Sequence, residues 1–93
     1  MLKIKAKVYF YGIEKKGLDK DGYSGMMASF SVNSELIMCK ILYKDINTVI
    51  KRGVEYTVDI ELPYGEMFID IIKTNYRFNI AYASMVVGEG IVI

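Results

Sequence analysis

The feature that most constrains this chain is an apolar residue at every second position. From residue 54 to 62, the residues Val54, Tyr56, Val58, Ile60 and Leu62 alternate with Glu55, Thr57, Asp59 and Glu61. Successive side chains of a strand point to opposite faces, so this segment is predicted to be a strand with one apolar and one acidic face. The same period recurs over residues 2–10, 26–32 and 76–83. A period of two favours strands over helices along the chain.

The remaining segments complete a set of six or seven predicted strands. Residues 35–43 form a mostly apolar run, residues 68–72 a shorter one whose facing is ambiguous, and residues 85–93 close the chain. Asn33-Ser34 is a signal for a two-residue turn between strands. Residues 12–25 are polar, charged and rich in glycine, which predicts a long surface loop.

These strands must share one small core. The chain has 93 residues, of which 53% are hydrophobic, which excludes intrinsic disorder and indicates a single domain over residues 1–93. Regularly spaced short strands are typical of sandwiches and barrels, and closing a barrel removes exposed strand edges. We therefore predict an all-β fold, a small closed antiparallel barrel of about six strands.

The composition excludes several chemistries. The chain has no histidine, so a Ser-His-Asp or Cys-His arrangement is impossible. Neither a metal-ligand spacing nor a glycine-rich phosphate loop occurs. We expect no catalytic residue, no cofactor, no metal and no bound nucleotide. Cys39, the single cysteine, lies in an apolar strand and is interpreted as a buried structural thiol. With no signal peptide and no membrane span in the sequence, a cytoplasmic location is expected.

One candidate site lies on the polar face of the first strand. Its members are Lys3, Lys5, Lys7, Tyr9 and Tyr11. Lysines interleaved with aromatic side chains can follow a phosphate backbone while bases stack on the rings. The alternative is an outward strand face whose lysines protect an edge. The pattern alone leaves both interpretations open.

Charge is distributed unevenly along the sequence, although the formal net charge is only +1. Residues 1–20 carry a net charge of +4, and residues 54–72 carry a net charge of −5. Two surfaces of opposite sign could steer binding partners. They could instead attract each other within the fold. Eight tyrosines add candidate anchors for a protein interface.

Gly88 and Gly90 interrupt the last predicted strand, which is otherwise rich in β-branched residues. Glycine weakens a strand, so two of them suggest a bulge or bend with strained backbone angles that lets the strand close the barrel. The alternative is the close approach of a ligand to Gly88-Glu89-Gly90.

The order of several short motifs resembles the C-terminal β-barrel domain of elongation factor Tu. The similar segments are Ala6–Phe10, Gly22–Met26, Ile50–Val54, Val58–Pro63, Arg77–Ile80 and Val87–Val92, which reads Val-Gly-Glu-Gly-Ile-Val. Together they extend over nearly the whole chain. The resemblance implies a six-stranded antiparallel barrel of Greek-key type.

The resemblance also implies contacts to RNA. In elongation factor Tu this third domain helps to hold the T-arm of aminoacyl-tRNA. Arg77, Glu89 and Gly90 match positions of the family's motifs, whereas residues 81–85 lack the family's Arg-Glu and Gly-Arg-Thr. The GTPase domain and the second barrel have no counterpart here, so we expect no GTP binding.

Two functional hypotheses follow. The first is a non-catalytic protein-binding module, such as a bacterial immunity or regulatory protein, because catalytic motifs are missing while charged faces and tyrosines are present. The second is an RNA- or tRNA-binding module related to translation, suggested by the resemblance and by the lysine–tyrosine face of the first strand.

Overall fold

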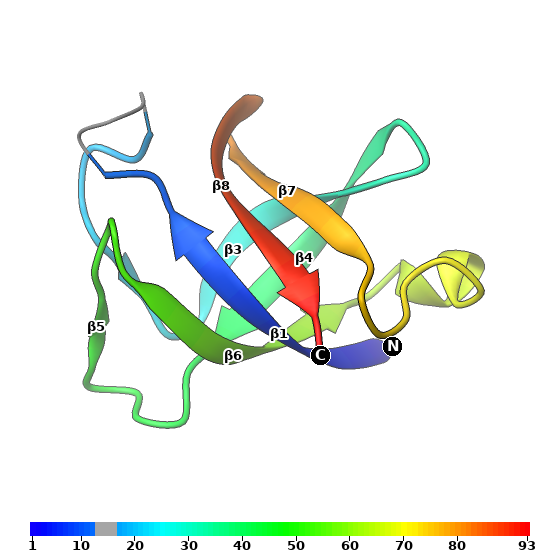
Figure 1. Ribbon diagram of the computed structural model, residues 1–93, viewed down its shortest axis with the longest axis horizontal. Helices are drawn as coiled ribbons and strands as arrows, with labels where there is room; N and C mark the ends of the chain where they lie inside the picture. The colour runs from blue at the N-terminus through cyan, green and yellow to red at the C-terminus, as the bar shows by residue number, and fades with distance from the viewer. Residues whose placement is uncertain (13–16) are drawn as a thin grey trace.

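Six strands close into an antiparallel barrel in the computed structural model, which describes residues 1–12 and 17–93. They are β1 (Leu2–Phe10), β3 (Met26–Val32), β4 (Glu35–Leu42), β6 (Glu55–Leu62), β7 (Arg77–Tyr82) and β8 (Met85–Val92). They follow one another around the barrel in the order β1-β6-β4-β3-β7-β8, and β8 pairs back onto β1 (Figure 1). The predicted fold class is confirmed.

The strand order is that of a Greek key. β3, β4 and β6 are neighbours in sequence order, and the chain's first strand, β1, lies beside β6. The first strand of the barrel therefore pairs with the last strand of the β3–β4–β6 meander. This topology puts strand ends that are far apart in sequence side by side.

The alternate apolar side chains of the strands point into the barrel and fill its interior, as the sequence predicts. In the β1–β6 pair, Ala6 lies opposite Val58 and Ile4 opposite Ile60, on the face that points inward. Apolar side chains from all six strands meet there, and the largest fully buried ones are Phe10, Phe30, Ile41, Ile60, Leu62 and Ile80 together with Ile50. The rings of Phe30 and Phe78 stack with centroids 4.2 Å apart.

Two glycines make room for these aromatic rings in β8. A Cβ on Gly90 would collide with the ring of Phe78 and lie 2.8 Å from the carbonyl oxygen of Lys7. A Cβ on Gly88 would lie 2.7 Å from the carbonyl oxygen of Tyr9 and 3.1 Å from the Phe10 ring. Neither glycine has a positive φ. The expected backbone strain is therefore wrong at Gly88 and Gly90, because close packing is what requires glycine there.

The predicted bulge is present beside these glycines. Ile80 lies opposite Gly88 while Ala81 lies opposite Val86, so Val87 is an extra residue in β8. Such an insertion bends the strand and increases its twist. Ala81 is buried although it is in register with Ser29 on the outer side of β3, and Tyr82, at the end of β7, is 51% exposed.

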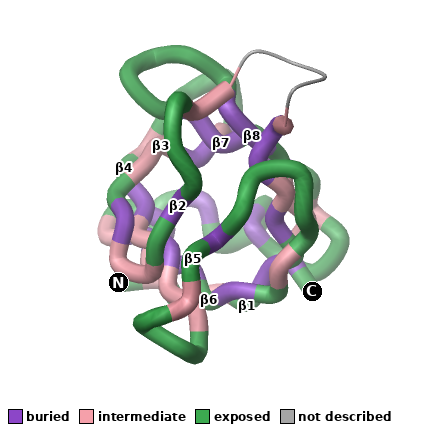
Figure 2. The backbone as a smooth tube through the Cα atoms, turned by 90° about the vertical axis from the view of Figure 1, so that its left-hand side faces the viewer, coloured by how far each residue is buried: buried purple, intermediate pink, exposed green. Residues whose placement is uncertain are grey.

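A two-stranded sheet lies across one end of the barrel. It pairs β2 (Gly22–Tyr23) with β5 (Val49–Ile50), and Figure 2 views the molecule from this side. Residues 12–25 were predicted to be a surface loop, and β2 lies within that range. The part of the predicted loop formed by residues 13–16 lies outside the described residues.

Two further details differ from the sequence prediction. The apolar run 68–72 is not a seventh barrel strand, because a 3₁₀ helix, η1 (Gly65–Phe68), leads into a turn there. Phe68 and Ile72 are buried in the core while Ile69 and Ile71 are exposed. Val54 precedes β6 and is 44% exposed. Over the described ranges, no helix has the length and apolar character needed to cross a membrane.

The facing of β6 can be tested with two neighbouring substitutions. Val58→Asp is expected to unfold the barrel, because Val58 is 2% exposed and a buried carboxylate costs several kcal/mol. Asp59→Val should change the free energy of unfolding by no more than about 1 kcal/mol, because Asp59 is exposed. Urea denaturation of both variants measures the difference. Equal destabilisation would contradict the facing of this strand.

The packing role of glycine in β8 gives a second prediction. Gly90→Val should lower the free energy of unfolding by at least about 1 kcal/mol, since the added side chain must displace the Phe78 ring or the β1 backbone. Ile91→Val, at the next and half-buried position, is the control and should cost less. Thermal melting of the two variants is the measurement. A Gly90→Val variant that melts like the parent would remove the packing argument.

Candidate functional site

The lysines of the predicted site face outward from β1, but acidic residues of β6 lie beside them. Lys3 pairs in register with Glu61 and Lys5 with Asp59. The Nζ atom of Lys5 lies 3.0 Å from Oδ1 of Asp59, and that of Lys3 lies 3.9 Å from Oε2 of Glu61. The basic and acidic segments of the sequence therefore attract each other within the fold, which was one of the two interpretations of the uneven charge.

These ion pairs change the chemistry of the face more than they change stability. The Lys5 and Asp59 side chains are 59% and 57% exposed, and exposed pairs contribute about 0–1 kcal/mol. Each carboxylate nonetheless cancels a positive charge that a phosphate would need. Lys7 lies opposite Thr57 instead, so it has an uncharged neighbour on β6. The face is thus a mixed-charge surface rather than a basic one.

The two tyrosines of the predicted site behave differently from the lysines. Tyr9 is half-buried and Tyr11 is 8% exposed, so both are less accessible than the lysines, and their ring centroids lie 6.3 Å apart. β1 ends at Phe10, and the N–H of Tyr11 then donates to the carbonyl of Val87 at 2.9 Å. The Tyr11 hydroxyl donates to Oε1 of Glu89 at 3.2 Å. Burial, and then this carboxylate, raise the pKa of Tyr11.

The residues singled out by the resemblance lie close to the β1 face. Arg77, Glu89 and Gly90 line one hollow of about 220 Å³. Glu89 is in register with Tyr9, and Ile91 separates Lys7 from Arg77. The pairing of β8 with both β1 and β7 therefore brings the two predicted sets of residues together. Gly90 contributes backbone here, since its missing side chain leaves space for Phe78.

The opposite outer surface of the barrel has a different character. Met38, Ser29, Ala81 and Val86 lie side by side across β4, β3, β7 and β8, each in register with the next. This row contains no charged side chain. Met38 and Val86 are 46% and 43% exposed, and neighbouring Met27 is 45% exposed. Ala81, between Ser29 and Val86 in this row, is only 1% exposed. We call Met27, Ser29, Met38 and Val86 the uncharged surface.

A groove of about 560 Å³ adjoins the uncharged surface at the end of β3 and β7. Most of its lining is apolar or aromatic, with Leu18, Tyr23, Met26, Tyr82 and Met85 among the residues that form it. Tyr23 and Tyr82 are 62% and 51% exposed. Its charged members come from the segment Asp19-Lys20-Asp21. A groove of this size and lining suits an apolar side chain of a partner.

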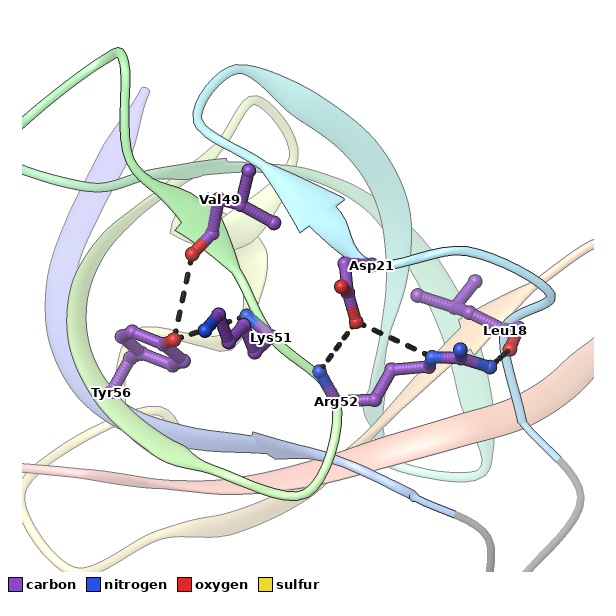
Figure 3. A network of polar contacts seen from close by, with 6 residues as sticks. All are labelled: Leu18, Asp21, Val49, Lys51, Arg52 and Tyr56. Atoms are coloured by element: carbon purple, nitrogen blue, oxygen red, sulfur yellow. Dashed lines mark hydrogen bonds and ion pairs between the residues drawn. The ribbon is translucent and has the colours of Figure 1, made fainter.

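A polar network fixes the segment that forms one wall of this groove (Figure 3). Both the backbone N–H of Arg52, at 2.9 Å, and its Nε, at 3.4 Å, donate to Oδ1 of Asp21. The Arg52 guanidinium also donates to the carbonyl of Leu18. These bonds and the charge of Arg52 lower the pKa of Asp21. Close by, the N–H of Lys51 donates to the hydroxyl of Tyr56 at 3.1 Å.

Sequence reasoning did not find the uncharged surface. Its residues come from three strands, so they become neighbours only when the register is known. One signal was available in the chain: the alternate positions Met27, Ser29 and Ser31 carry no charge, unlike the alternate positions of residues 2–10 and 54–62.

No protein-family model matches this chain, and no curated protein is significantly similar to it in sequence. The resemblance to elongation factor Tu therefore stays a prediction from the order of motifs. Among residues 1–12 and 17–93, no three His, Cys, Asp or Glu side chains are grouped as a metal site would need.

The state of Cys39 gives a prediction about pH. The thiol is fully buried, and desolvation raises its pKa from 9.0 to about 12. Above about pH 9 the unfolded chain ionises this thiol while the folded chain does not, so the free energy of unfolding should fall by up to about 1.4 kcal/mol per pH unit. Cys39→Ala removes this contribution, leaving a shallower decline between about pH 8 and about pH 10. Urea unfolding across that range measures both slopes, and equal slopes would contradict a buried neutral thiol.

Proposed function

We propose that this chain is a non-catalytic protein-binding module that docks its partner on the uncharged surface. The observation that carries the proposal is the registered row Met38–Ser29–Ala81–Val86, which crosses four strands without a charged side chain. Exposed apolar side chains on one face of a small domain are typical of an interaction site, and Met27, Met38 and Val86 are each more than 40% exposed. Methionine suits such a surface, because its flexible thioether adapts to a partner's shape.

The adjoining groove supports the same proposal. A partner seated on the uncharged surface could place an apolar side chain between Tyr23 and Tyr82, which both line the groove. Buried anchors of this kind supply much of the binding energy of protein interfaces. The network around Arg52 and Asp21 holds one wall of the groove in place, so little ordering is needed on binding.

The broader assignments are proposals of the same kind. The order of the six strands is compatible with a relationship to the C-terminal barrel of elongation factor Tu. A role as an immunity or regulatory protein would need only a binding surface. The single, buried cysteine supports a cytoplasmic location, because small secreted domains usually depend on disulfides.

The experiment is a quantitative binding comparison. A partner is recovered by co-purification from the source cells, and its affinity for the purified chain is measured by calorimetry. Met27→Lys combined with Val86→Lys should weaken binding at least about tenfold, because the new charges would be desolvated at the interface. Thr57→Lys combined with Thr74→Lys, which adds the same two charges at exposed positions elsewhere, is the control and should bind like the parent.

Two outcomes would contradict this function. Repeated co-purification without a protein partner is one. The other is salt-dependent binding of tRNA that Lys5→Glu abolishes and Lys44→Glu retains, which would favour an RNA-binding module. The ion pairs of Lys3 and Lys5 argue against that result.

A further inference from the structure

β4 pairs with a strand on each side, but the two pairings differ in length. β3 pairs with it from Glu35 to Ile41, whereas β6 pairs with it only from Lys40 to Leu42. β6 ends at Leu62, and Pro63, which follows, has no N–H to offer. The chain then turns away into the loop that carries η1, while the β3–β4 hairpin projects separately (Figure 1). The first half of β4 is therefore an open edge.

The hydrogen bonds of β4 show which residues face this edge. The carbonyl of Ile41 accepts from Gly25 at 2.7 Å, and both backbone groups of Tyr43 bond to the hydroxyl of Ser24. The odd-numbered residues of β4 thus point their backbone N–H and C=O groups toward β3. Because the direction alternates along a strand, Leu36 and Met38 point theirs toward the open edge. In the described part of the chain, no hydrogen bond occupies the edge-facing groups of these two residues.

Between Glu35 and Lys40 this edge has no charged side chain and no proline. The side chains of Leu36 and Met38 are 50% and 46% exposed. An edge with free backbone groups and apolar side chains is a template for another strand.

We propose that a second copy of this chain occupies this edge, joining the two barrels through antiparallel β4 strands. The register follows from the space available. A two-fold axis at Met38 or Ile37 would push the partner's hairpin tip into β6, which already covers β4 from Lys40 onward. A two-fold axis at Leu36 avoids this clash with β6. The turn of each β3–β4 hairpin then reaches only as far as Met38 of the second copy.

This register is self-complementary. The N–H of each Leu36 donates to the carbonyl of the other Leu36, so two donors and two acceptors are satisfied by one symmetric contact. Glu35 lies opposite Ile37 of the second copy, so no like charges meet. The Met38 side chains extend the uncharged surface of one copy toward that of the other. The contact uses backbone at the edge and is independent of the proposed function.

Sedimentation velocity over a range of protein concentrations tests the proposal. The parent should show a concentration-dependent dimer. Leu36→Pro removes the central donor from both copies while leaving the bonds to β3 intact, so the dissociation constant should rise at least about tenfold. Leu36→Ala keeps the N–H and is the matched control, with a smaller effect. Ile37→Pro should instead destabilise the fold, because its N–H faces β3.

Amide hydrogen exchange on the parent protein provides a test without substitution. The Leu36 amide should exchange more slowly as concentration rises, whereas exposed amides elsewhere should not change. A monomer at all concentrations would overturn the proposal, and so would a dimer that Leu36→Pro leaves intact. A monomeric chain that loses a different protein partner on Leu36→Pro would also overturn it, by assigning the edge to that partner.

Discussion

The closure of the barrel through β1 is the constraint on which the rest of the structure depends. β1 pairs with β6 along nearly its whole length and with β8 from Ala6 to Phe10. Closure needs β8 to approach β1 and β7 closely while the rings of Phe10, Phe30 and Phe78 fill the interior. Gly88 and Gly90 supply that space, and the bulge at Val87 supplies the bend. In a domain of 93 residues there is little other core to compensate for a loss of this packing.

Alternation predicts the strands well where the chain follows it without interruption. β1, β3 and β6 have the predicted facing because polar and apolar residues alternate through them. The Asn33-Ser34 turn is also predictable, since both residues adopt positive φ and asparagine tolerates it. Ala83-Ser84 forms a similar turn with φ of 51° and 67°, which nothing in that dipeptide predicts. There the pairing of β7 with β8 imposes the turn, and local propensity opposes it.

The candidate sites were predictable to the extent that each lies on one strand. The lysines of β1 and the acids of β6 could be assigned to outward faces, but only the register shows that they neutralise one another. Tyr11 follows the end of β1 and is covered by its surroundings, which the alternation of β1 does not show. The uncharged surface required the pairing of four strands, and the bulge within β8 decides which side Val86 faces. Long-range pairing is information that a periodic pattern in one segment does not contain.

The two sides of the barrel now explain why a nearly neutral chain has such uneven charge. Along the β1–β6 pair, opposite charges lie next to each other and largely cancel. They therefore leave only a weak electrostatic field to steer a distant partner. Under the proposed function, recognition would depend on short-range features. These features are the uncharged surface, the groove beside it and the open backbone edge of β4, and all three lie on or beside β3 and β4. The β3–β4 pair, which carries Met27, Met38 and the open edge, is therefore where the proposed contacts with another protein would form.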